Sequence, residues 1–170
     1  MHVPHGRIDQ QGSEQMTGKI DARLAELGHD LPDAAAPVAN YVPFATSGSL
    51  VFISGQLPLK DGKLLYTGKV GPSVSVEEAA AAAQQSALNV IAQLKAACGG
   101  DLDRVKQVIK LGGFVAAGDE FTSHPKVING ASDLMVDVFG DAGRHARAAV
   151  GCPSLPLDAP VEVEAIIEIA

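Results

Sequence analysis

The residues best suited to chemistry lie at the end of the chain, in the segment RAAVGCPSLPLDAPVEVEAIIEIA from Arg147 to Ala170. Arg147 begins an otherwise apolar stretch, so its guanidinium must reach either solvent or an anion. Glu162, Glu164 and Glu168 follow, separated by even numbers of positions. An arginine can hold a carboxylate through two hydrogen bonds, and a glutamate can orient water or transfer a proton. The segment therefore predicts either a polar site for a small anion or a solvated sheet face.

Residue types and spacing do not decide between these two interpretations. Arg147 could form a salt bridge with a neighbouring carboxylate, which is a common surface arrangement of low energy. The glutamates could line a solvated face, because a strand places alternate side chains on opposite sides. In that pattern Val161, Val163, Ala165, Ile167 and Ile169 share one face, and Glu162, Glu164, Ile166 and Glu168 share the other.

Other kinds of catalytic site lack support. His124 and His145 are isolated in the sequence, and the two histidines near the N-terminus have no acidic partners, so a zinc site is not indicated. Cys98 and Cys152 do not form a CxxC motif, and Cys152 has no neighbouring base that would make it a nucleophile. The sequence contains neither a G-x-S-x-G motif nor a phosphate-binding loop.

The composition limits the possible classes of function. The 170 residues are 46% hydrophobic and 19% charged, which fits one folded domain with a sizeable core. A net charge of −7 and the absence of tryptophan argue against a nucleic-acid partner, which needs clustered basic residues or stacking aromatics. No apolar run is long enough to cross a membrane, and no signal-peptide core is evident. We expect a cytoplasmic protein with neither a nucleic-acid nor a membrane partner.

The N-terminal part differs in pattern from the rest of the chain. Residues 1–17 are polar without periodicity and are expected to form a disordered tail. Residues 18–29 predict a short amphipathic helix, and the Pro- and Ala-rich stretch that follows predicts an extended linker. We therefore expect a single domain over 18–170, in which a helix and linker (18–37) precede the core (38–170).

The predicted strands begin with a hairpin. Residues 41–45 and 50–56 flank a tight turn, and the second strand is nearly all apolar, so we expect it to be covered on both faces. A short strand is expected at 64–66 and a long one at 104–115, where Gly112-Gly113 indicates a bulge or a close backbone contact. The closing segment predicts two strands joined by a turn that contains prolines.

Two long helices are expected between these strands. Residues 75–98 start with a capping box of Ser75 and Glu78, and residues 123–139 carry one apolar stripe. The order hairpin, helix, strand, helix, strand, strand predicts an α+β fold with a single mixed sheet and two helices packed on one face. The other face would remain exposed, so a second copy of the chain is its expected cover.

Several segments, taken in order, resemble the RidA/YjgF family of reactive imine and enamine deaminases, formerly grouped as endoribonuclease L-PSP. The match spans about residues 38–170 and consists of Ile53-Ser54-Gly55-Gln56-Leu57-Pro58, Arg147, Leu155-Pro156 and Val161-Glu162-Val163-Glu164-Ala165-Ile166. The resemblance implies a chorismate-mutase-like fold assembled as a homotrimer, with the sheets facing a central barrel and clefts between subunits.

The same resemblance assigns roles to particular residues. It implies that Arg147 binds the carboxylate of the substrate and that Glu162 orients or activates water, while Tyr41 and Gly55 line the cleft. Ala149, placed where many members have cysteine, is expected beside the substrate. The implied reaction is hydrolysis of small reactive enamine or imine carboxylates to 2-keto acids and ammonia, without a metal or a cofactor.

The chain departs from the family pattern in its N-terminal extension and in residues 140–146, which form a shorter approach to the arginine. The shorter approach leaves a second hypothesis open, in which the same cleft binds a small carboxylate or a partner protein without catalysis. A ribonuclease is disfavoured by the acidic composition, the few aromatic residues and the lack of a histidine pair. Glu164 and Glu168 are expected to be structural or solvated.

Overall fold

The computed structural model describes residues 18–36 and 40–170, so the expected disordered tail (1–17) lies outside the described residues. At its centre is a five-stranded sheet with the order β1-β2-β7-β5-β6. β5 and β6 run parallel and the other neighbouring pairs run antiparallel, which makes the sheet mixed, as predicted. The strands are β1 (Phe44–Ser47), β2 (Leu50–Gln56), β5 (Val105–Ala116), β6 (Ala146–Cys152) and β7 (Val161–Ile169).

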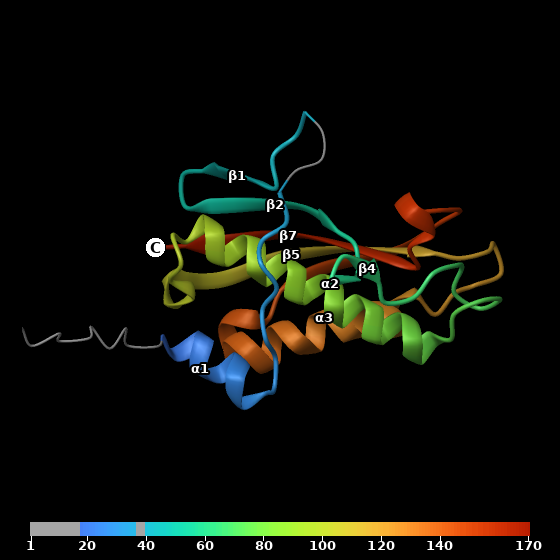
Figure 1. Ribbon diagram of the computed structural model, residues 1–170, viewed down its shortest axis with the longest axis horizontal. Helices are drawn as coiled ribbons and strands as arrows, with labels where there is room; N and C mark the ends of the chain where they lie inside the picture. The colour runs from blue at the N-terminus through green and yellow to red at the C-terminus, as the bar shows by residue number, and fades with distance from the viewer. Residues whose placement is uncertain (1–17, 37–39) are drawn as a thin grey trace, which may run out of the picture.

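Two long helices, α2 (Val76–Ala97) and α3 (His124–Phe139), pack on one face of this sheet (Figure 1). The predicted capping box starts α2: the Ser75 hydroxyl accepts from the Glu78 amide at 3.1 Å, and the Glu78 carboxylate accepts from the Ser75 amide at 2.8 Å. The apolar stripe of α3 is buried, as are the odd-numbered side chains of β7. The α+β fold therefore follows from the two hydrophobic periodicities of the sequence. Within 18–36 and 40–170, no helix is both long and apolar enough to cross a membrane.

The opposite face of the sheet is open in the single chain. Phe52 of β2 is 42% exposed and Val150 of β6 is 46% exposed. The expectation that β2 is covered on both faces is therefore wrong for the single chain. Val51 and Ile53 are buried on the helix side, whereas Phe52 between them points to the open face.

The closing segment forms the two predicted strands, whereas the predicted short strand needs correction. The closing strands β6 and β7 do not pair with each other, because β5 lies between them and pairs with both. Their connection contains a short 3-10 helix, η3 (Pro156–Asp158). The short strand expected at 64–66 is instead β4 (Lys63–Leu64), which pairs with β3 (Leu59–Lys60) in a separate two-stranded sheet.

The Gly112-Gly113 pair marks close contacts rather than a bulge. A Cβ atom on Gly113 would lie 2.5 Å from Cγ1 of Ile128 in α3, and one on Gly112 would lie 2.7 Å from Oε1 of Glu164 in β7. The register shifts of β5 fall earlier, between Val105 and Lys110. The two glycines let α3 approach one face of β5 while Glu164 lies against the other.

The N-terminal extension is fixed to the core by polar contacts. Helix α1 (Lys19–Glu26) begins against Asp103, whose carboxylate accepts from the first two amides of the helix, each at 2.9 Å. These two hydrogen bonds lower the pKa of Asp103. The linker then crosses α2, where the Gln93 side chain donates to the Ala35 carbonyl at 2.9 Å (Figure 1). The extension is thus a docked part of the fold where it is described.

Candidate functional site

Arg147 lies on β6, an edge strand of the sheet, and its side chain turns toward α3. One terminal nitrogen, Nη1, donates to Asn129 Oδ1 at 2.9 Å and to Ser132 Oγ at 3.1 Å. No ion pair among the described residues includes Arg147. The salt-bridge interpretation is therefore wrong for this part of the chain, and the partners of the arginine there are neutral.

The guanidinium keeps a free edge. Nη1 carries two hydrogens, and Asn129 and Ser132 accept both of them. The Nε and Nη2 donors have no acceptor within the described part of the chain. These donors lie side by side on the planar group and match the two oxygens of a carboxylate. Arg147 is exposed, so a carboxylate from outside the chain can reach this edge.

Ala149 lies on the same face of β6, two positions beyond Arg147. It pairs in register with Gly113 of β5 and is half-buried. Ile128 of α3 fills the space over Gly113, and Ala149 packs against the edge of the same core. Ala149 therefore lies on a packed part of the sheet edge, two positions from the exposed arginine.

Gly55 and Glu162 meet at the end of β2, on the open side of the sheet. The register between β2 and β7 shifts between Ile53 and Gln56, which places Gly55 in a β-bulge. The Glu162 carboxylate packs directly on Gly55, where a Cβ atom would collide with Oε1. A glycine at this point is what allows the carboxylate to occupy its position.

The surroundings of Glu162 raise the pKa of its carboxyl group. Burial is the main cause, and the negative charge of Glu164 adds to it, because both effects disfavour the ionised form. Glu164 is exposed on the same face of β7, as expected for a solvated residue. A glutamate with a raised pKa exchanges its proton closer to neutral pH, which suits a general base or acid.

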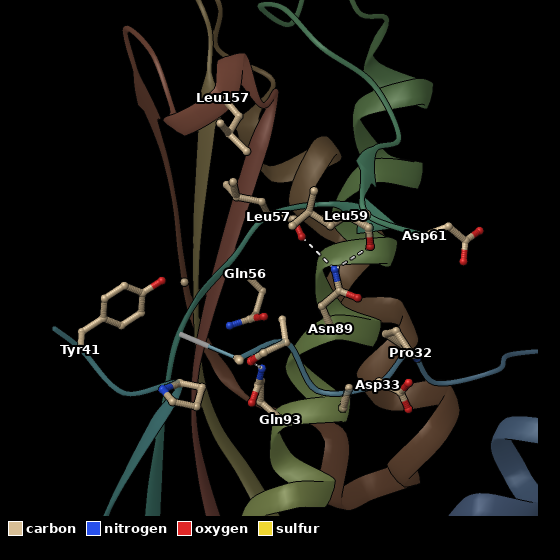
Figure 2. A pocket seen from close by; sticks show the side chains of 16 residues that line it. Pro32, Asp33, Tyr41, Gln56, Leu57, Leu59, Asp61, Asn89, Gln93 and Leu157 are labelled. Carbon is tan, nitrogen blue, oxygen red and sulfur yellow. Dashed lines mark hydrogen bonds between the residues drawn. The ribbon is translucent and has the colours of Figure 1, made fainter. Parts of the chain in front are cut away.

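Tyr41 lies just before β1 and is held near β2 through its neighbours. The Ser54 hydroxyl donates to the Val42 carbonyl at 2.7 Å, and the Ser54 amide donates to the Pro43 carbonyl at 3.0 Å. Tyr41 and Gly55 both line a cavity of about 490 Å³ (Figure 2). This volume lies within the usual range of small-molecule pockets.

One wall of this cavity carries amide side chains that were not expected from the sequence. Asn89 of α2 donates to the carbonyls of Leu57 and Leu59 at 2.9 and 3.0 Å, as Figure 2 shows. Gln85 donates to the Leu59 carbonyl at 3.2 Å, and Gln93 holds the linker. These amides recur every four positions and so share one helix face, a spacing that could have identified them. Gln85 and Asn89 fix the loop after β2, Gln93 fixes the linker, and both segments carry part of the cavity wall.

Arg147 and Glu162 lie on opposite faces of the sheet. Arg147 of β6 pairs in register with Leu111 of β5, and Leu111 pairs with Ala165 of β7. Glu162 of β7 pairs instead with Phe114 of β5. Leu111 is buried against the helices, so Arg147 shares the helix side. Glu162 follows buried Val161 and points to the open side. A single chain does not bring the two groups together.

The predicted site residues therefore form two groups. We call Arg147 with Ala149, on edge strand β6, the arginine half-site. We call Glu162, Gly55 and Tyr41, grouped around the end of β2, the glutamate half-site. The first can hold an anion, and the second can transfer a proton. Of the second group, Tyr41 and Gly55 line the cavity and Glu162 does not.

Comparison with known proteins identifies relatives over most of the chain. The YjgF/chorismate mutase-like family model, whose description also carries an endoribonuclease label, matches residues 21–169. Protein TCP17 of Trypanosoma cruzi is 50% identical over 154 residues, which cover 90% of this chain and 96% of that protein. The crystal structure of Atu1372 from Agrobacterium tumefaciens is 54% identical with a TM-score of 0.84, covering 89% of this chain and 92% of that one. E. coli TdcF with bound serine is 26% identical with a TM-score of 0.57, covering 81% and 94%.

The matched region contains the whole five-stranded sheet, both long helices and every residue of the two half-sites. The similarity therefore extends to the elements that position the candidate site, and not only to the helices that cover the core. A family match of this extent, supported by relatives at 50% and 54% identity, means that the chain belongs to the YjgF/chorismate mutase-like family.

Proposed function

We propose that this protein hydrolyses small reactive enamine and imine carboxylates to 2-keto acids and ammonia. The observation that carries the proposal is the free Nε–Nη2 edge of Arg147, which has no carboxylate partner among the described residues. An exposed guanidinium held by neutral groups is suited to binding a substrate carboxylate through two hydrogen bonds. The related TdcF holds serine, a small carboxylate with a nitrogen on the adjacent carbon, as in the proposed substrates.

The proposed reaction needs positioning and proton transfer. Arg147 fixes the substrate carboxylate and thereby the adjacent carbon of the C=N group. Water attacks this carbon, ionised Glu162 accepts a proton from the water, and the C=N electrons move to nitrogen. Glu162 passes this proton to the nitrogen, which gives a carbon bearing one hydroxyl and one amino group. Glu162 then moves the hydroxyl proton to the amino group, so the C–N bond breaks, ammonia leaves and the C=O bond of the keto acid forms. An enamine first becomes an imine by protonation at carbon, and no step requires a metal or a cofactor.

We propose that a homotrimer completes the site between subunits, with the sheets facing a central barrel. The arginine half-site lies on an edge strand, and Glu162 lies on the open face. Exposed Phe52 and Val150 offer apolar surface on that open face to a neighbouring subunit. A neighbouring copy can bring its own Arg147 to Glu162, which the single chain does not do.

A non-catalytic function of the same cleft is the second candidate. It is favoured by residues 140–146, where the turn η2 (Gly140–Gly143) leads directly into β6 and makes the approach to Arg147 short. The two half-sites would then hold a small carboxylate or a partner protein without turnover. Saturable binding of a 2-keto acid, with no deamination above the spontaneous rate, would favour this candidate.

Release of 2-keto acid from imino acids generated by an amino-acid oxidase tests the proposal. The wild-type protein should accelerate release, and Arg147→Ala should lose about a hundredfold or more, because two charge-assisted hydrogen bonds contribute about 3 kcal/mol or more. Arg144→Ala is the matched control, because Arg144 is exposed and pairs with Asp141 at 3.4 Å. An Arg147→Ala protein as active as wild type would refute the proposed role of the arginine.

A further inference from the structure

Ser132 and His145 form a hydrogen-bonded pair behind Arg147. Ser132 Oγ lies 2.9 Å from His145 Nε2 and 3.1 Å from Arg147 Nη1. On the far side, His145 Nδ1 lies 2.6 Å from the carbonyl oxygen of Gly143. These groups form a continuous chain from the backbone at Gly143 to the guanidinium, and the proposed reaction uses neither the serine nor the histidine.

The direction of each hydrogen bond follows from the carbonyl at the end of the chain. A carbonyl oxygen only accepts, so in the neutral imidazole the proton lies on Nδ1 and Nε2 keeps its lone pair. The Ser132 hydroxyl then donates its single hydrogen to Nε2 of His145. Its lone pairs are left for Arg147, whose Nη1 donates to them. In this way His145 makes Ser132 an acceptor for the arginine.

The segment that carries His145 is anchored on two sides. Gly143 is buried against α3, where a Cβ atom would collide with the Met135 carbonyl oxygen. The next carbonyl, that of Arg144, accepts a hydrogen bond from Gln107 of β5. The Gly143 carbonyl therefore has a fixed position, and it fixes the orientation of the imidazole in turn.

We propose that Ser132 and His145 are positioning residues for carboxylate binding by Arg147, an inference that rests on the proposed function. Together with Asn129 they hold Nη1 from behind and keep the Nε–Nη2 edge directed outward before the substrate arrives. Such preorganisation reduces the freedom lost on binding. The effect falls on KM rather than on kcat, because neither side chain touches the reacting atoms.

Steady-state kinetics of single and double variants tests the inference. Ser132→Ala and His145→Phe should each raise KM about tenfold, equivalent to about 1.4 kcal/mol, with kcat changed by less than about threefold. Because His145 acts through Ser132, adding His145→Phe to Ser132→Ala should raise KM no further. His145→Gln, which can place an amide oxygen near the Nε2 position, should recover most of the loss.

The matched control is Asp133→Ala, an exposed neighbour of Ser132 on α3, which should leave KM unchanged. Thermal unfolding of each variant separates a misfolded protein from one with a misplaced arginine. An unchanged KM in a folded His145→Phe protein overturns the inference. An additive rise in the double variant overturns it as well, since the two residues would then act independently.

Two readouts without turnover separate this inference from the proposed reaction. Nitrogen–proton NMR spectra at mildly alkaline pH should show His145 as the Nδ1–H tautomer, and an Nε2–H tautomer would overturn the inference. Calorimetry with 2-oxobutanoate should show binding about tenfold weaker in Ser132→Ala. If that loss occurs in a protein that does not deaminate imino acids, the proposed reaction fails and the positioning role stands. If binding does not depend on Arg147, both fail.

Discussion

The division of the site into two half-sites predicts that two inactive variants restore each other's activity. Arg147→Ala removes the carboxylate clamp from the edge of the sheet, and Glu162→Gln removes the ionisable group from the open face. Each variant alone should retain less than about one hundredth of wild-type activity, the usual effect of losing a charge-assisted clamp or a general base. In trimers that contain both variants, some clefts combine an intact Arg147 with an intact Glu162.

The magnitude follows from the way each cleft is built. In the proposed trimer, each cleft takes one arginine half-site and one glutamate half-site from different subunits. If both variants assemble at random from equal amounts, each half-site is intact with a chance of about one half, so about one quarter of the clefts are complete. Each mixed trimer has about one complete cleft in three, so purified mixed trimers should reach about one third of wild-type activity.

The assay is release of 2-keto acid by mixed trimers, purified through two different tags after co-expression. Co-expression of Glu162→Gln with Gly55→Ala is the control, because both changes damage the glutamate half-site and leave no complete cleft. Light scattering establishes the number of subunits. Mixed trimers no more active than either parent would refute the division of the site between subunits.

Further predictions concern the glutamate half-site and the glycines. If ionised Glu162 is the base, the rate should rise as the pH passes through the raised pKa of Glu162. Glu164→Gln removes a negative charge that raises this pKa, so the rise should move to lower pH. A rise at unchanged pH would assign the titration to another group. Glu162→Gln should raise Tm at neutral pH. A glutamate whose pKa is raised in the folded state contributes fully to folding stability below its unfolded pKa of about 4.3, and this contribution is lost as the pH rises through the folded pKa. The gain in Tm of Glu162→Gln should therefore vanish in acid. Gly55→Ala should reduce kcat far more than stability, because the added methyl group displaces the Glu162 carboxylate. Gly113→Ala should instead lower the free energy of unfolding by about 1–3 kcal/mol in denaturant titrations, because its methyl group meets Ile128 in the core.

Features that depend on local periodicity could be predicted from the sequence. The alternation from Val161 to Ile169 decides which side of β7 is buried, and the stripe of α3 does the same for the helix. The capping box of Ser75 and Glu78 is equally local. None of these features requires knowledge of which elements become neighbours, which is why the α+β class and the face of Glu162 could be derived in advance.

Features that depend on long-range pairing could not be predicted. The closing strands follow each other in the chain, yet β5 lies between them in the sheet. The partners of Arg147 depend on that arrangement, because parallel pairing of β6 with β5 carries the arginine to Asn129 and Ser132, which lie 18 and 15 positions earlier. A salt bridge fitted the spacing equally well, and the neutral partners in the structure decided against it.

Placing Arg147 and Glu162 on opposite faces of the sheet keeps each group in the state that the proposed reaction needs. Side by side in one chain they would form an ion pair, which would occupy the free edge of the guanidinium and lower the pKa of the carboxyl group. Apart, Arg147 retains its Nε and Nη2 donors within the described chain, and burial with the charge of Glu164 keeps the pKa of Glu162 raised. In the proposed cleft between subunits, the substrate carboxylate would take the guanidinium edge and its C=N group would lie between the two half-sites. Glu162 then meets water rather than the arginine, and this is the condition under which it can act as a base.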